Sequence, residues 1–143
     1  MPRGLYDIRL KLEVWSKIAA FSPDYVFCIT NQPKMEQEKL AAWDVMIKYV
    51  MYSLAEYLRL PYDNCRCLTK FGYQRQDDDV KPGLGLMKRA LSLLPQDYTY
   101  SRENLVVIGS NSGYSNQGDQ DRKMAYNAQI DYVDVWDLLV SYN

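Results

Sequence analysis

Hydroxyl and amide groups, a lysine and several carboxylates are the side chains of this sequence that could carry out chemistry together. Histidine is absent from all 143 residues, which excludes histidine general bases, Ser-His-Asp triads and most catalytic zinc sites. A hydroxyl and a lysine bind anionic oxygens and carboxylates bind a hard cation, so the set suits a phosphoryl group with Mg²⁺. The candidate residues are Thr30, Asn31, Gln32, Lys81, Ser110, Asp119 and Asp121.

Apolar periodicity predicts the elements that would position these residues. Helical spacing covers about the first twenty residues and then residues 35–60, 83–94, 121–127 and, as a closing helix, 135–140. Short apolar runs rich in β-branched and aromatic residues predict strands at residues 25–30, 65–71, 105–109 and 130–133. We expect the first and third of these strands to be buried on both faces, as in a parallel sheet.

Strands that alternate with helices predict an α/β fold with a mainly parallel sheet, whose ligand site lies beyond the carboxyl ends of the strands. Thr30, Asn31 and Gln32 come at the end of the first strand, and residues 110–121 follow the third. Lys81 opens the helix between them. The topology therefore predicts that the candidate residues converge on one edge of the sheet.

Length, charge and cysteine content restrict the class of protein. A chain of 143 residues predicts one domain over residues 1–143. The 17 basic and 18 acidic residues nearly cancel, so no global field steers the chain toward nucleic acid or membrane. The charged N-terminal region predicts neither a signal peptide nor a membrane span. The three cysteines Cys28, Cys65 and Cys67 have no disulfide framework spacing, which predicts a cytoplasmic protein.

Four segments, in this order, resemble the haloacid-dehalogenase (HAD) superfamily, in particular its small-capped phosphatases of the histidinol-phosphate and polynucleotide 3′-phosphatase type. Residues 27–32, Phe-Cys-Ile-Thr-Asn-Gln, are similar to the second motif of that group. Residues 81–84, Lys-Pro-Gly-Leu, are similar to the third motif. Residues 106–109 followed by residues 121–133 resemble the fourth motif and the next strand. The resemblance implies a three-layer α/β/α Rossmannoid fold.

The resemblance also implies roles for individual residues. Thr30, Asn31 and Ser110 would contact the substrate phosphate, and Lys81 would bind it and act in catalysis. Asp121, with Asp119 as a neighbour that could substitute, would hold Mg²⁺. The implied activity is hydrolysis of a phosphomonoester, with a small phosphorylated molecule or a nucleic-acid 3′-phosphate as substrate.

The sequence departs from the family pattern at its most important motif. The Asp-x-Asp-x-Thr motif, which supplies the nucleophile and the general acid/base from the central strand, is absent. Ser110 stands where the fourth motif has Asp, and Gln129 stands where the family usually has glycine. A covalent aspartyl-phosphate mechanism cannot run without the attacking carboxylate. The chain is therefore expected to be inactive by itself, and the alternative is a catalytically dead HAD-like module that binds a partner or ligand.

The absent strand would lie between the strands at 25–30 and 105–109. We expect that the chain derives from a longer reading frame, is completed by self-association or a partner chain, or has closed its sheet around the gap. Simpler explanations exist for single residues. Lys81 alone would be a solvated lysine, Thr30 a turn hydroxyl, and Asp121 a first-turn carboxylate that stabilises its helix. Cys65-x-Cys67 offers two thiolates, too few for a zinc site, and is interpreted as part of a strand.

Overall fold

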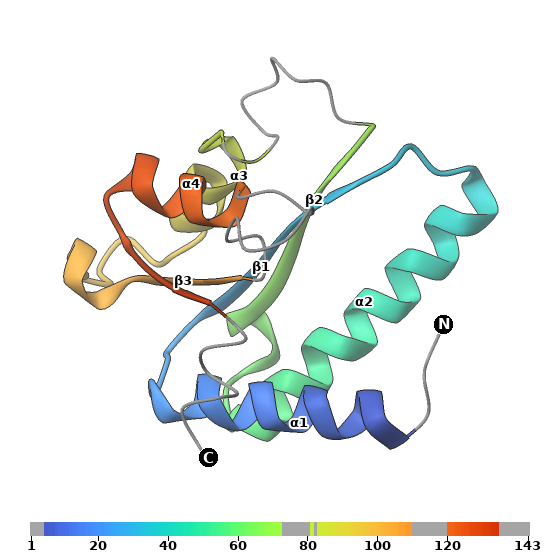
Figure 1. The fold of residues 1–143 in the computed structure, drawn as a ribbon, viewed down its shortest axis with the longest axis horizontal. Coiled ribbons are helices and arrows are strands. Elements are labelled where there is room, and N and C mark those ends of the chain that lie inside the picture. The colour runs from blue at the N-terminus through green and yellow to red at the C-terminus, as the bar shows by residue number, and fades with distance from the viewer. Residues whose placement is uncertain (1–4, 73–80, 82, 110–119, 135–143) are drawn as a thin grey trace.

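The computed structural model describes residues 5–72, 81, 83–109 and 120–134, within which helices and strands alternate (Figure 1). The helices are α1 (Leu5–Ala20), α2 (Gln37–Leu58), α3 (Gly85–Ser92) and α4 (Gln120–Ala128). The strands are β1 (Val26–Gln32), β2 (Cys65–Phe71), β3 (Val106–Gly109) and β4 (Asp131–Asp134). The predicted α/β class is confirmed, while the expected closing helix over 135–140 lies outside the described residues.

The four strands form two separate parallel pairs. β1 pairs with β2, Val26 lying opposite Cys65, and β3 pairs with β4, Val106 lying opposite Asp131. Parallel strands need a crossover connection, and α2 and α4 provide a helix in the two crossovers. The described chain therefore contains two βαβ units, β1–α2–β2 and β3–α4–β4.

β1 and β3, between which the absent strand was expected, belong to different sheets in the described part of the chain. The expectation that the sheet has closed around the gap is therefore wrong for these residues. The described N-terminal residues form helix α1 and contribute no strand. Each unit keeps its own two-stranded ladder because no described strand joins the edges of β1 and β3.

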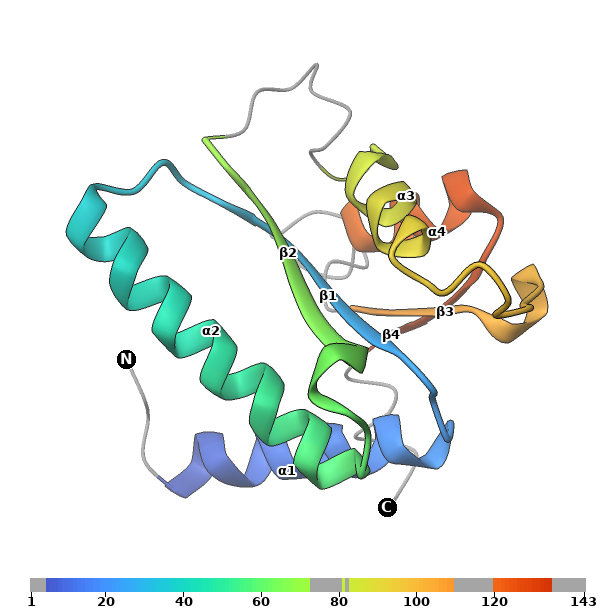
Figure 2. The same cartoon turned by 180° about the vertical axis from the view of Figure 1, so that it is seen from behind.

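The helices lie on both sides of the β1–β2 pair, with α1 and α2 on one side and α3 and α4 on the other (Figures 1 and 2). Met51, Leu54 and Ala55 of α2 form a buried core with Cys65 of β2. The ring of Trp15 in α1 packs against this core. The core thus fixes α1 and α2 against one face of the pair.

The strands are less buried than the sequence predicted. Every residue of β1 is half-buried, and Val106 at the start of β3 is 36% exposed. A strand in the middle of a wide parallel sheet is covered by helices and flanked by strands on both sides. β1 and β3 have one strand neighbour each in the described structure, so their apolar side chains stay in part accessible.

α2 is the longest helix, with 22 residues, and ends with a left-handed residue. Arg59 has φ 57°, and the Leu60 N–H donates to the Ala55 carbonyl at 2.9 Å. This bond satisfies a carbonyl that the last turn would otherwise leave unpaired. Neither α2 nor any other described helix combines the length and apolar character needed to cross a membrane.

Candidate functional site

An ion pair joins two of the predicted site residues. The Lys81 Nζ donates to Asp121 Oδ1 at 2.6 Å, although the two residues are 40 positions apart in the sequence. Their side chains are only 12% and 11% exposed. The predicted convergence of Lys81 and Asp121 is therefore confirmed, and Lys81 is not a solvated lysine.

Two helix starts bring these side chains together. Lys81 lies shortly before α3, and Asp121 lies in the first turn of α4. A carboxylate in a first turn interacts favourably with the helix dipole and the unpaired N–H groups. The first-turn explanation of Asp121 is thus confirmed, and it holds together with the contact to Lys81.

Gly109, the last residue of β3, leaves room for Asp121. A Cβ at Gly109 would lie 2.5 Å from Asp121 Oδ2 and 2.7 Å from Asp121 Cβ, well inside van der Waals contact. Only glycine lets α4 approach β3 this closely. Sequence reasoning missed this contact; the available signal was a glycine at the end of an apolar strand with an acidic residue shortly after it.

The end of β1 arranges its polar residues on opposite faces. Gln32 Nε2 donates to Thr30 Oγ1 at 2.8 Å, which places both side chains on one face. Asn31 lies between them, and side chains alternate along a strand, so Asn31 points to the other face. The predicted end of this strand at residue 30 is wrong, since β1 continues through Gln32. Thr30 and Asn31 therefore do not share one face of the sheet.

The packing of α2 against the strands identifies the two faces of β1. Cys28 belongs to the same alternating set as Thr30 and packs against the core built on α2. Asn31 thus lies on the side of α3 and α4, the helices that hold the Lys81–Asp121 pair. Its Oδ1 is buried and accepts no hydrogen bond from the residues that the structure describes. Asn31 is accordingly a better placed partner for Lys81 than Thr30 is.

The described residues do not form a magnesium site by themselves. Asp121 supplies one carboxylate, and Lys81 already neutralises it. Within the described ranges no three Cys, Asp or Glu side chains come together as metal ligands, whereas Mg²⁺ requires about six oxygen ligands. Asp119 and Ser110, two further predicted site residues, lie outside the described residues.

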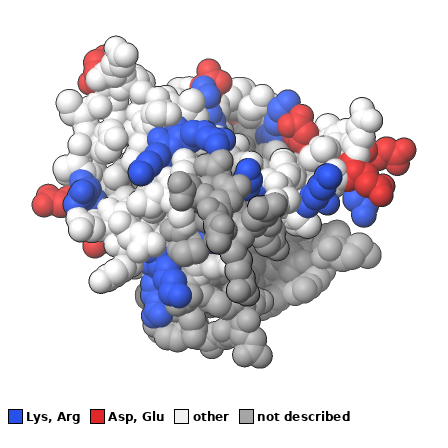
Figure 3. Space-filling model, turned by 90° about the horizontal axis from the view of Figure 1, so that it is seen from above, with Lys and Arg blue, Asp and Glu red and all other residues white. Residues whose placement is uncertain are grey.

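Both basic and acidic side chains lie on the face toward which β1 and β2 run, among the residues that the structure describes (Figure 3). Lys88 and Arg89 of α3 and Arg122 and Lys123 of α4 are exposed surface charges.

A pair of cysteines faces α2, on the other side of the β1–β2 pair. Cys28 and Cys67 lie directly opposite each other in the parallel ladder, and their side chains are hydrogen-bonded. Sequence analysis missed this pairing, because the register of the two strands is not visible in the sequence. Cys65 and Cys67 are strand residues, as predicted.

Comparisons of the chain with protein-family models, with curated proteins and with solved structures give no match. The site is therefore characterised by its own geometry. The site consists of the largely buried ion pair between Lys81 and Asp121, which lies beside Gly109 at the end of β3. Asn31 lies on the face of β1 that is turned toward α3 and α4.

Proposed function

We propose that the chain is a HAD-like phosphatase domain that hydrolyses a phosphomonoester once a further segment supplies the attacking carboxylate. The observation that carries the proposal is the sheltered contact between Lys81 and Asp121 at the carboxyl end of β3. The fold would be a three-layer α/β/α arrangement in which a fifth strand lies between β1 and β3. That strand would come from a partner chain, a second copy or a polypeptide segment outside this sequence.

Lys81 is suited to hold a phosphoryl group. Its ammonium has three N–H donors, and the bond to Asp121 uses one and fixes the position of the others. A positioned lysine binds anionic phosphoryl oxygens and stabilises charge that builds up on them during transfer. Asn31 Oδ1 is an acceptor, so it suits the hydroxyl of a protonated phosphate or of the substrate alcohol.

Two features of the described structure support this proposal. Lys81 contacts Asp121 beside β3, and it lies close enough to β1 for its charge to oppose in part the rise in the pKa of the Cys28 thiol that the Cys67 hydrogen bond and burial cause. It therefore lies near both strand pairs, where a segment between them would meet it. In addition, Gln129 adopts φ 58°, a left-handed conformation that favours glycine, which is the residue common at this position in the family that the chain resembles.

The proposal includes Mg²⁺ only if residues outside the described ranges supply further ligands. Asp121 would contribute one carboxylate, Asp119 is the neighbouring candidate, and a segment between β1 and β3 would have to bring further oxygens. The substrate would be a small phosphorylated molecule or a nucleic-acid 3′-phosphate.

The second candidate function is a non-catalytic module that binds an anionic ligand or a partner chain. It is favoured by one observation: the Lys81–Asp121 pair is complete in itself, with a donor and an acceptor matched at 2.6 Å. In this case Lys81 and Asp121 hold the two βαβ units together, and phosphate binds without being transferred.

Complementation in trans distinguishes the two functions. A synthetic peptide with an apolar strand followed by Asp-x-Asp-x-Thr is added to the purified chain with Mg²⁺ and p-nitrophenyl phosphate. A phosphatase domain gives turnover that is lost when the first Asp of the peptide is replaced by Asn and in Lys81→Met. Lys88→Met, at an exposed lysine of α3, is the matched control and keeps the turnover.

Binding of inorganic phosphate, measured by the rise in melting temperature, completes the test. Stabilisation by phosphate in wild type and Lys88→Met but not in Lys81→Met, without turnover, selects the binding module. Turnover or phosphate binding that survives both Lys81→Met and Asp121→Asn would contradict the assignment of this site.

A further inference from the structure

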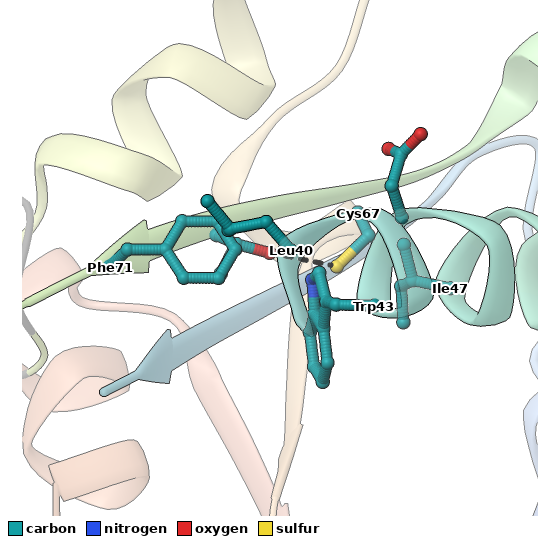
Figure 4. A pocket seen from close by; sticks show the side chains of 7 residues that line it. Leu40, Trp43, Ile47, Cys67 and Phe71 are labelled. Atoms are coloured by element: carbon teal, nitrogen blue, oxygen red, sulfur yellow. Dashed lines mark hydrogen bonds between the residues drawn. The ribbon is translucent and has the colours of Figure 1, made fainter. Parts of the chain in front are cut away.

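The cavity between α2 and β2 is separate from the Lys81 site and has a thiol in its wall. Its volume is about 390 Å³. Leu40, Trp43 and Ile47 of α2 form one side, and Cys67, Thr69 and Phe71 of β2 form the other (Figure 4). A cavity of this size holds a small organic molecule.

The wall of the cavity carries aromatic rings beside a similar share of polar surface. The rings of Trp43 and Phe71 meet edge to face, with centroids 6.3 Å apart and an interplanar angle of 84°. Cys67 is half-buried and lines the same cavity as Trp43 (Figure 4).

Two hydrogen bonds act on the Cys67 sulfur. Thr69 Oγ1 lies 3.5 Å from the Cys67 Sγ, and the Cys28 side chain is its other partner. The Cys28 thiol is the first cause that lowers the pKa of Cys67 to about 7, and the Thr69 hydroxyl lowers it further, against the opposing effect of burial. The same bond raises the pKa of Cys28 far above its ordinary value. Cys28 thus stays protonated, and its S–H donates a hydrogen bond to the Cys67 thiolate.

Asp44 is the charged side chain among the lining residues. Its carboxylate is 60% exposed and pairs with Lys48 at 2.9 Å. The charge of Lys81 acts on Cys28 and opposes the rise in the pKa of that thiol, so it does not favour the Cys67 thiolate. The cavity therefore combines the Cys67 sulfur with the rings of Trp43 and Phe71.

We propose that Cys67 is a covalent modification site for small apolar electrophiles of the α,β-unsaturated carbonyl class, whose apolar part packs against Trp43 and Phe71. The Cys67 sulfur forms a bond with the β-carbon of the reagent, and the π pair of the C=C bond moves to the α-carbon. The α-carbon takes a proton from water, so thiol and alkene give a thioether without an oxidant. This site goes beyond the proposed phosphatase and does not depend on it.

The expected rate follows from the ionisation of the thiol. At pH 7 a thiol with a pKa of about 7 is about half ionised, against about 1% for a thiol at the unperturbed pKa of 9.0, which is roughly a fiftyfold gain in thiolate. Nucleophilicity falls with pKa along a Brønsted slope of about 0.4–0.5, which leaves a net gain of about sixfold. Cys65 is only 3% exposed and burial raises its pKa, so it should react much more slowly than Cys67.

The test uses maleimide reagents on the native full chain, with peptide mass spectrometry to measure labelling at each cysteine. N-phenylmaleimide should label Cys67 at least about ten times faster than Cys65 or Cys28. Thr69→Val, which removes a donor and keeps the shape, should slow labelling of Cys67 severalfold. Equal rates at all three cysteines, or faster labelling of Cys28, would overturn the proposal.

The role of the cavity is tested by the choice of reagent. The ratio of the rates with N-phenylmaleimide and with N-(2-carboxyethyl)maleimide should be at least about threefold higher at Cys67 than for glutathione, because the phenyl ring packs on Trp43. This preference should be lost in Trp43→Ala and kept in Tyr49→Ala, whose ring on the same helix is 71% exposed. A wild-type ratio equal to that of glutathione would overturn the cavity assignment without any need for a variant.

Discussion

The contact between Lys81 and Asp121 can be compared with a second pair of the same residue types in the opposite environment. Lys81 and Asp121 lie 2.6 Å apart with side chains 12% and 11% exposed, whereas Lys48 and Asp44 lie 2.9 Å apart with side chains 61% and 60% exposed. We expect Lys81→Met to lower the free energy of unfolding by about 3 kcal/mol, since it leaves a sheltered carboxylate without its cation. Lys48→Met should change it much less, because solvent screens an exposed ion pair.

The magnitude depends on where the unpaired carboxylate is left. Asp121 is 8% exposed as a whole residue and packs against Gly109, so water reaches it poorly once Lys81 is gone. The first turn of α4 offsets part of the cost through its dipole, by about 0.5 kcal/mol. This offset places the expected value at the lower end of the range of about 3–5 kcal/mol for removing one partner of a buried pair.

Two double-mutant cycles measured by urea unfolding, with far-UV circular dichroism as the signal, provide the assay. Lys81→Met and Asp121→Asn form one cycle, and Lys48→Met and Asp44→Asn form the other. We expect a coupling energy of about 2 kcal/mol for the first pair and a much smaller one for the second. Equal coupling energies in the two cycles, with unchanged m-values, would refute the reasoning that burial makes the Lys81 contact strong.

Three further predictions concern backbone packing, a helix end and a thiol. Gly109→Ala should destabilise the chain by about 2 kcal/mol, because the new Cβ overlaps Asp121, and a melting temperature equal to wild type would contradict the packing of α4 on β3. Arg59→Gly should stabilise by about 0.5–1 kcal/mol in the same assay, since Arg59 adopts φ 57° at the end of α2, and a loss of stability would contradict this. The rate of Cys67 labelling should rise with pH through a midpoint of about 7, because only the thiolate reacts, whereas a midpoint near 9 would show that Cys28 and Thr69 do not stabilise the thiolate.

The sequence predicted the order and type of the elements because apolar periodicity is a local property. Both β2 and the α2 crossover lie within a few residues of their predicted limits. Burial was predicted less well, because it depends on which strands become neighbours. The apolar run at the start of the third strand suggested complete burial, yet Val106 is 36% exposed because β3 has only β4 beside it in the described structure.

The sequence predicted the contacts of the candidate site that depend on the order of helices and strands. It did not predict those that depend on the direction in which a side chain points. Lys81 and Asp121 meet because both lie where a helix begins beside the sheet, which the alternation of elements implied. Thr30 and Asn31 were expected to act together, but β1 continues through Gln32 and turns them to opposite faces. The Cys28–Cys67 pair depends on strand register, which sequence spacing alone does not reveal.

The two βαβ units share no ladder hydrogen bonds in the described structure, which has a consequence for how the molecule opens. Elements that are not joined by a common sheet can unfold locally as separate cooperative units, each with its own free energy of opening. The contact from Lys81 to Asp121 ties the approach to α3, which packs on β1 and β2, to α4 of the second unit. We expect that loss of this ion pair increases amide-proton exchange in β3–α4–β4 more than in β1–α2–β2.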